Sequence, residues 1–76
     1  MTLSFERRLG KEIAERRNSL GFSQERLGYL CDLHRTYISE VERGVKSPTV
    51  RTLRVIASAL RTSAADLLAS AEGGGR

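Results

Sequence analysis

The sequence contains one cysteine and one histidine among its 76 residues. A single cysteine excludes a disulfide within the chain, and one cysteine with one histidine excludes a zinc finger. Aromatic residues make up only 5% of the chain, too little for the stacking surface that single-stranded nucleic acid binders use. No run approaches the roughly 18 apolar residues of a membrane span, and no signal-peptide pattern opens the chain. We therefore expect a cytoplasmic protein with no metal, cofactor or membrane partner.

The remaining composition fits one small globular domain. Hydrophobic residues make up 39% of the chain and charged residues 29%. A chain of this length lies near the lower limit for independent folding, so it needs efficient packing or a partner. The net charge is +4, carried mostly by arginine, and this charge suits an anionic partner.

Apolar residues recur at helical spacings along the whole chain, and we find no strand between them. Serine or threonine precedes most of these runs as a capping residue, and Gly21 and Gly44 end the first and third. Gly10, inside the first run, lowers helix stability by about 1 kcal/mol relative to alanine, and close helix packing is the explanation we can offer. The expected helices span about 5–20, 24–31, 35–43, 50–60 and 64–71.

The second and third expected helices are about two turns long, and a turn of three or four residues joins them. Helices this short are unstable alone, so we expect them to pack against each other as a steeply crossing pair. Gly28, in the middle of the first of the two, permits the backbones to approach, and Ile38 and Val41 pack from the second. This construction is typical of a helix-turn-helix, whose second helix enters the major groove of DNA.

The segment SQERLGYLCDLHRTYISEVERG (23–44) resembles the helix-turn-helix of the phage Cro/repressor-like family, the XRE type. Within that family, RTYIS (35–39) followed by ERG (42–44) resembles the controller proteins of bacterial restriction–modification systems. The resemblance implies an all-α, five-helix, lambda-repressor-like DNA-binding domain over 1–71. Its helix-turn-helix would lie at about 23–43, its dimerisation region at about 50–71 and a flexible tail at 72–76.

Three residues at the start of the third helix are candidates for reading bases. Arg35 can donate two hydrogen bonds to guanine O6 and N7, the commonest specific base contact. Thr36 and Ser39 point the same way on a helix and can touch base edges or a thymine methyl group. The alternative for Arg35 is a solvated surface arginine or a phosphate clamp, and for Thr36 and Ser39 it is an ordinary exposed polar side chain.

A larger set of residues is expected to contact the DNA backbone, which positions a protein without reading sequence. Gln24 begins the second helix, where unpaired N–H groups favour a phosphate, and family members use this glutamine to grip the backbone. Tyr37 can instead pack on the second helix, and Arg51 can instead be a solvated charge. The expected backbone contacts are Ser23, Gln24, Tyr37, Arg43, Lys46, Ser47, Thr49 and Arg51.

The resemblance also implies a largely buried ion pair between Arg17 and Glu42, which joins the first helix to the third. His34 stands at an N-cap position where Ser, Thr or Asp is usual, so we expect a weak cap there. Arg61 stands where the family usually ends a helix with glycine. Cys31 lies next to Leu30 on an inner face, so we expect a small core residue and not a redox switch.

A dimer is expected because one helix-turn-helix reads only a few base pairs. The C-terminal third carries more apolar side chains than one helical stripe buries, and the family dimerises through this region. The alternative is that all of these side chains fold into the core of one chain. The candidate interface residues are Val55, Leu60, Leu67 and Leu68.

Together these features predict a sequence-specific transcription regulator that binds inverted-repeat operators on double-stranded DNA as a homodimer. The controller resemblance implies that it regulates its own promoter and a restriction–modification operon, with RNA polymerase as a further candidate partner. Alternatives are a phage-type repressor or antitoxin of the same fold, and a protein-interaction module without DNA binding. The chain has no nucleophile–base pair, metal cluster or phosphate-binding glycine loop, so we expect neither an enzyme nor a small-molecule site.

Overall fold

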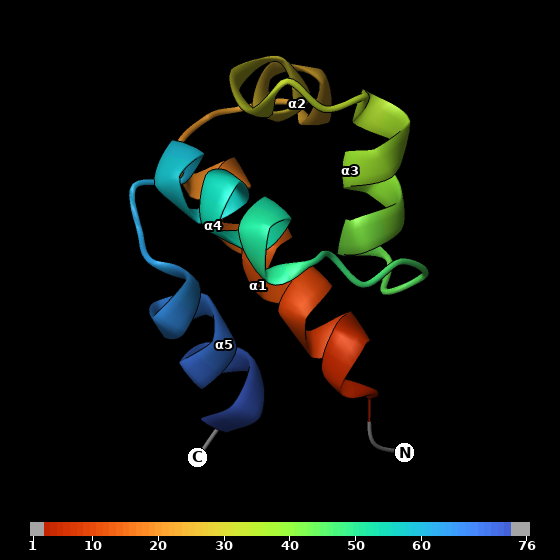
Figure 1. The fold of residues 1–76 in the computed structure, drawn as a ribbon, viewed down its shortest axis with the longest axis vertical. Helices are drawn as coiled ribbons and strands as arrows, with labels where there is room; N and C mark the ends of the chain where they lie inside the picture. The colour runs from red at the N-terminus through yellow and green to blue at the C-terminus, as the bar shows by residue number, and fades with distance from the viewer. Residues whose placement is uncertain (1–2, 74–76) are drawn as a thin grey trace.

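The computed structural model describes residues 3–73, which form five α-helices and no strand. The helices are α1 (Phe5–Ser19), α2 (Gln24–Cys31), α3 (Arg35–Glu42), α4 (Val50–Ala59) and α5 (Ala64–Gly73). Figure 1 shows α1 running through the middle of the molecule, with α3 at one edge and α5 at the other. The all-α prediction is therefore confirmed.

Side chains of the residue before each helix determine where the helices begin. Each accepts a hydrogen bond from a backbone N–H group that the first turn leaves unpaired. His34, expected to cap weakly, accepts from the Thr36 N–H through Nδ1 at 3.0 Å. At the other helix starts the acceptor is a hydroxyl, at 2.9 to 3.1 Å from a nitrogen three residues later, on Ser4, Ser23, Thr49 and Ser63.

Four helices end with a residue in the left-handed region, and each of these ends carries the paired backbone hydrogen bonds of a Schellman motif. Two of the four residues are the expected glycines, Gly21 and Gly44, both at φ 78°. Asp32 and Arg61 adopt the same conformation at φ 57° and 62°. Arg61 therefore ends α4 as the usual glycine would, at some cost in backbone strain.

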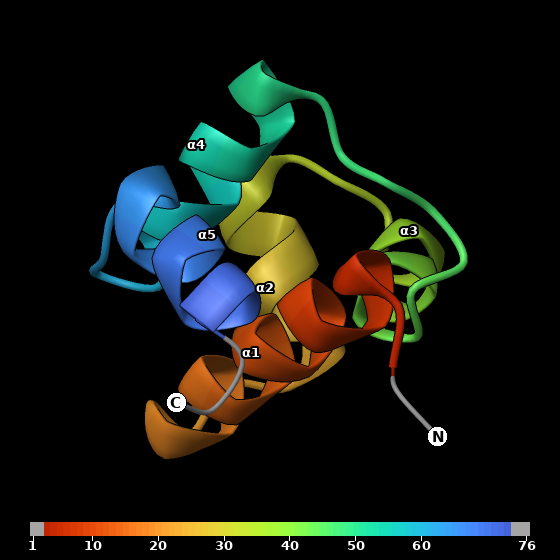
Figure 2. The same ribbon diagram turned by 90° about the horizontal axis from the view of Figure 1, so that it is seen from below.

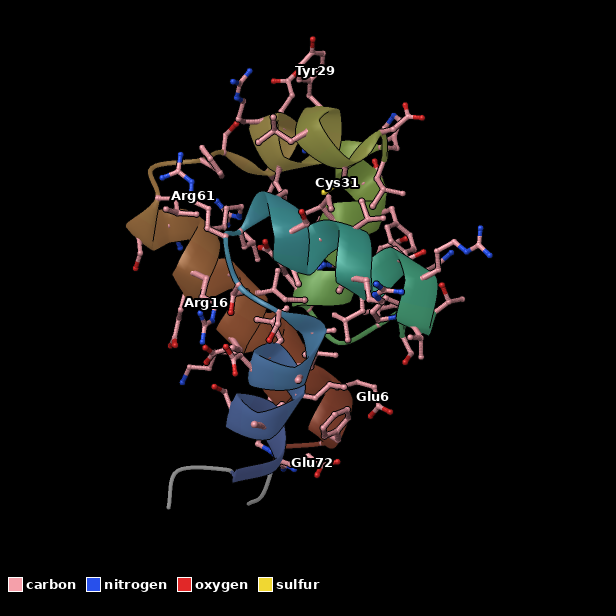
Figure 3. All side chains as sticks on the ribbon, turned by 60° about the vertical axis from the view of Figure 1, so that its left-hand side comes forward. Glu6, Arg16, Tyr29, Cys31, Arg61 and Glu72 are labelled. Carbon is pink, nitrogen blue, oxygen red and sulfur yellow. The ribbon has the colours of Figure 1, made fainter. Side chains whose placement is uncertain are left out.

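The core lies where all five helices meet, and the described residues bury no polar or charged side chain completely. Burial raises the pKa of the Cys31 thiol, which lies in this core as expected (Figure 3). The thiol is therefore protonated and shielded from solvent. The core side chains are Leu9, Ile13, Leu27, Cys31, Ile38, Val41, Leu53, Ile56, Ala57, Leu60, Leu67 and Ala71.

Helix α5 packs along α1, as the view from below shows (Figure 2). Arg8 of α1 strengthens this contact, because its Nε donates to the carbonyl oxygen of Ala71 at 2.7 Å. The helix extends through Glu72 and Gly73, so the expectation of a flexible tail from residue 72 is wrong for these two residues. The rest of that expected tail, 74–76, lies outside the described residues.

Two glycines inside helices allow close contacts between backbones. A Cβ added at Gly10 would collide with the carbonyl oxygens of Val41 and Glu42, so only glycine lets α1 approach the end of α3. A Cβ at Gly28 would lie 2.5 Å from the carbonyl oxygen of Leu33, in the turn between α2 and α3. Both glycines therefore position α3, and the packing explanation offered for Gly10 holds. Among the described helices, none is long and apolar enough to cross a membrane.

Candidate nucleic-acid interface

Helices α2 and α3 form the expected helix-turn-helix. They contact each other directly, and α3 also packs on α1, with Ile38 and Val41 pointing inward. The opposite side of α3 faces away from the other helices, at the edge of the molecule (Figure 1). This arrangement leaves one side of a short helix free to enter a groove of DNA.

The three expected base-reading residues lie on α3 as follows. Arg35 and Thr36 are exposed, in the first turn, and Ser39 is half-buried one turn later. The Ser39 hydroxyl accepts a hydrogen bond from Arg43 Nε at 3.4 Å. Arg35 takes part in no ion pair with another described residue, so its five guanidinium N–H donors have no carboxylate partner in this part of the chain.

The Arg17–Glu42 ion pair forms, and it is bidentate. Arg17 Nε and Nη2 donate to the two carboxylate oxygens of Glu42 at 2.7 and 3.0 Å. The two side chains are only 11% and 6% exposed. Arg17 Nη1 also donates to the carbonyl oxygen of Phe22 at 2.8 Å, so one guanidinium connects α1, the loop before α2 and the end of α3.

Gln24 joins this network, which sequence reasoning did not anticipate. Its amide nitrogen donates to a Glu42 oxygen at 2.9 Å. An amide nitrogen carries two hydrogens, so a second donor remains for a DNA phosphate. The ion pair therefore orients the side chain that was expected to grip the backbone.

The other expected backbone contacts differ in how free their polar groups are. Tyr37 is half-buried against the core, and burial raises the pKa of its phenol, so the hydroxyl stays a donor at neutral pH. Thr49 already donates to Thr52 Oγ1 at 3.0 Å and accepts from the Thr52 N–H, which engages its hydroxyl within the chain. Lys46 lies 3.8 Å from Glu40 in an exposed pair. The exposed members of the set are Ser23, Arg43, Lys46, Ser47, Thr49 and Arg51.

The structure corrects half of the expected dimer interface. Leu60 and Leu67 are 3% and 0% exposed within one chain, so the expectation that they line an interface is wrong. Their side chains fill the core beneath α4 and α5 and offer no surface to a partner. Val55 is 41% exposed, and Leu68 is half-buried at the edge of the core. These two side chains remain available.

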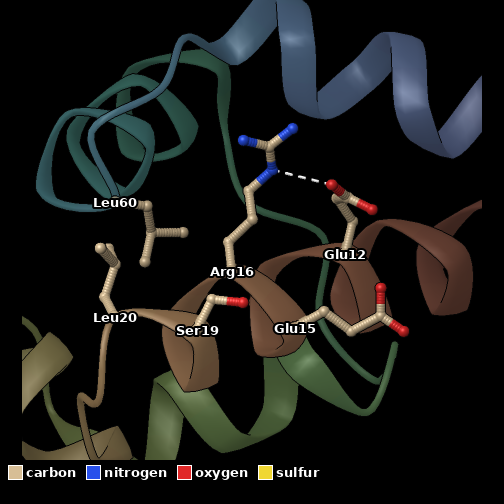
Figure 4. A pocket seen from close by; sticks show the side chains of 6 residues that line it. All are labelled: Glu12, Glu15, Arg16, Ser19, Leu20 and Leu60. Carbon is tan, nitrogen blue, oxygen red and sulfur yellow. Dashed lines mark hydrogen bonds and ion pairs between the residues drawn. The ribbon is translucent and has the colours of Figure 1, made fainter.

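A pocket of about 380 Å³ at the end of α1 carries the opposite electrostatic character (Figure 4). Two carboxylates, Glu12 and Glu15, line it beside Leu60. Arg16 Nε, the cation in this pocket, is paired with Glu12 at 2.7 Å. Phosphate oxygens would meet carboxylates here, so this pocket is no part of a nucleic-acid interface. In the described part of the chain, no group of His, Cys, Asp and Glu side chains could hold a metal ion.

Comparisons with known proteins agree with this geometry. A helix-turn-helix family model matches residues 13–67. The control protein C.BamHI of Bacillus amyloliquefaciens is 38% identical over 69 residues, which cover 90% of this chain and 85% of that protein. The control protein C.SmaI of Serratia marcescens is 43% identical over 60 residues, which cover 79% and 71%.

Among solved structures, the restriction–modification controller protein C.Esp1396I, as a tetramer with its natural 35-base-pair operator, superposes with a TM-score of 0.81. It is 27% identical, and the match covers 96% of each chain. The chain therefore belongs to the XRE-type helix-turn-helix family of DNA-binding transcription regulators and resembles the controller proteins of bacterial restriction–modification systems.

Proposed function

We propose that this chain binds an inverted-repeat operator on double-stranded DNA as a homodimer, with α3 of each protomer in the major groove. The observation that carries the proposal is the exposed side of α3. It presents Arg35 and Thr36 at its N-terminal end, while the inward side is anchored by Ile38 and Val41. A helix held this way inserts as a rigid body, with its first residues nearest the bases.

Arg35 carries sequence recognition in this proposal. Its guanidinium can make the bidentate contact to guanine O6 and N7 that is worth about 1–3 kcal/mol of discrimination against another base. Thr36 and Ser39 are the neighbouring polar side chains on the same side of α3. Each half of the operator is therefore expected to contain a guanine opposite Arg35.

Contacts to the DNA backbone surround this reading helix. Gln24 is oriented by Glu42, and the exposed cations Arg43, Lys46 and Arg51 follow α3 along the chain. They neutralise phosphates on both sides of the groove, with Ser23, Tyr37, Ser47 and Thr49 as hydroxyl contacts. Such contacts supply affinity that falls with salt and fix the register of α3.

Dimerisation doubles the sequence that one helix-turn-helix can read. Val55 on α4 and Leu68 on α5 are the candidate residues that keep apolar surface outside the core. The resemblance to control proteins supports the finer role: control of its own promoter and of a restriction–modification operon, with RNA polymerase as a further partner. C.Esp1396I binds its natural operator as a tetramer, which supports the same kind of target here.

The test is selection of binding sites from random duplex DNA, followed by titration of the winning site at several salt concentrations. We expect an enriched inverted repeat whose selection is lost for Arg35→Ala. Arg61→Gln, which removes an exposed cation beyond the end of α4, serves as the control and should select the wild-type site. If no sequence is enriched and duplex binding is weak at all salt concentrations, the proposal fails. The result then favours the alternative of a protein-interaction module without DNA binding.

A further inference from the structure

The N-terminal half of α1 is held firmly beside the C-terminal end of α3. Gly10 allows its backbone to touch the carbonyl oxygens of Val41 and Glu42. At Gly44 the space for a side chain is filled by Arg7, whose Cα and Cγ would lie 2.9 and 2.6 Å from an added Cβ. These contacts give α1 little freedom relative to the recognition helix.

This packing creates a groove of about 520 Å³ between α1 and the segment that follows α3. Arg7 and Lys11 lie one turn apart on α1, and Arg43 lies across the groove at the end of α3. All three cations are exposed. The remaining lining includes Leu3, Val45 and Glu42. Two cations of α1 and one from the distant end of α3 therefore surround one open surface next to the expected DNA contacts.

The carboxylates near this groove do not neutralise its cations. Both oxygens of Glu42 already accept from Arg17, and one of them also accepts from Gln24. Glu40 pairs with Lys46, and Glu12 with Arg16. Among the ion pairs of the described residues, none includes Arg7, Lys11 or Arg43. Three cations without carboxylate partners on one concave surface favour an anion with several oxygen acceptors.

We propose that Arg7 and Lys11 are phosphate-binding residues, which extend the DNA-backbone contacts from α3 and its loop onto α1. This inference rests on the proposed function and deepens it. Arg43 belongs to both surfaces, so the phosphate bound at this groove is the neighbour of one already contacted at the end of α3. Because a phosphate carries no sequence information, the added contacts raise affinity for every duplex and leave base selection unchanged.

The test uses the double variant Arg7→Gln/Lys11→Gln in the full chain. Glutamine keeps the Cβ and Cγ atoms that pack against Gly44, and thermal unfolding checks that the fold is retained. The slope of log affinity against log salt concentration should become shallower by roughly 0.9 for each phosphate that the variant no longer neutralises. Affinity should fall by the same factor on the selected operator and on unrelated duplex, and the selected sequence should not change.

A matched control separates direct contact from a general loss of positive charge. Arg16→Gln/Arg61→Gln removes the same charge away from this groove: Arg16 lines the pocket beside Leu60, and Arg61 follows the end of α4 in a separate hollow. This control should keep nearly the wild-type salt slope. Phosphate-ethylation interference adds a positional readout, because ethylation of one particular phosphate in each half-site should weaken binding of the wild type and leave the Arg7→Gln/Lys11→Gln variant unaffected.

The results distinguish failure of the groove proposal from failure of the proposed function. A double variant with the wild-type salt slope, or with the slope of the Arg16→Gln/Arg61→Gln control, overturns the phosphate-binding role of α1. A changed base preference overturns it as well, since that result assigns these residues to sequence reading. If the wild-type protein itself binds no duplex with salt dependence, the proposed function has failed and the groove proposal fails with it.

Discussion

At the scale of single residues, the Arg17–Glu42 pair connects stability with recognition. Arg17 on α1 and Gln24 on α2 both donate hydrogen bonds to the Glu42 carboxylate. The same guanidinium also holds the carbonyl group of Phe22, in the loop between those two helices. A carboxylate that is only 6% exposed depends on these donors, because it has little access to water. The pair also orients Gln24, one of the proposed phosphate contacts.

Removing one partner should therefore be costly. Arg17→Met should lower the free energy of unfolding by about 3 kcal/mol, because it leaves Glu42 without its bidentate partner. The double variant Arg17→Met/Glu42→Leu should recover most of this loss, since no unpaired charge remains. Urea unfolding of the three proteins measures both effects, and a single variant as stable as the wild type would contradict the role of the pair.

At the scale of helices, the crossing of α1 and α3 decides where the recognition helix sits. At Gly10, helix propensity favours alanine, whereas the packing of α1 against α3 favours glycine. In an isolated helix, alanine would be more favourable than glycine by about 1 kcal/mol. In the folded chain, the added methyl group would meet the carbonyl oxygens of Val41 and Glu42, and backbone atoms cannot move aside as a side chain can.

We expect the tertiary contact to prevail. Gly10→Ala should lower the free energy of unfolding by about 1–3 kcal/mol, the usual range for overpacking. It should also weaken operator binding, because α1 and α3 must separate. The control Glu15→Ala changes an exposed position of the same helix and should stay within about 0.5 kcal/mol of the wild type. A Gly10→Ala protein with a raised unfolding temperature would show that helix preference prevails.

At the scale of the whole molecule, burial within one chain decides which apolar side chains remain for a partner. Val55 is 41% exposed on α4, and Leu68 is half-buried on α5. Leu60 and Leu67, by contrast, are buried in the core. A dimer built on α4 and α5 would let the α3 helices of its two protomers read two half-sites about one helical turn apart.

A charge at this surface should separate the protomers without unfolding them. We expect Val55→Glu to convert a dimer into a monomer in sedimentation velocity at tens of micromolar, with unchanged helical circular dichroism. Operator affinity should fall roughly 100-fold or more, because the two half-sites no longer bind as one unit. Tyr29→Glu, at a 76% exposed position on α2, should keep the dimer mass. A wild-type protein with the mass of a monomer would refute the proposed dimer.

The helix starts, the ends of the first four helices to within a residue and the helix-turn-helix could be predicted from the sequence, because the interactions that set them are local. A capping serine reaches a nitrogen three residues away, and a Schellman motif joins residues no more than five apart. Such interactions leave a pattern that can be read in a short window. His34 and Arg61 depart from the usual residue types, yet they adopt the same local geometry.

Contacts between distant segments were decided only by the tertiary structure. In the sequence, Leu60, Leu67 and Val55 are all apolar residues of expected helices, and nothing local distinguishes them. The packing of α4 and α5 buries the two leucines and leaves the valine exposed. Likewise, nothing in a local window brings Arg7 and Lys11 beside Arg43. Their approach depends on a glycine contact between helices some thirty residues apart, and helix-crossing geometry arises from packing that no local preference encodes.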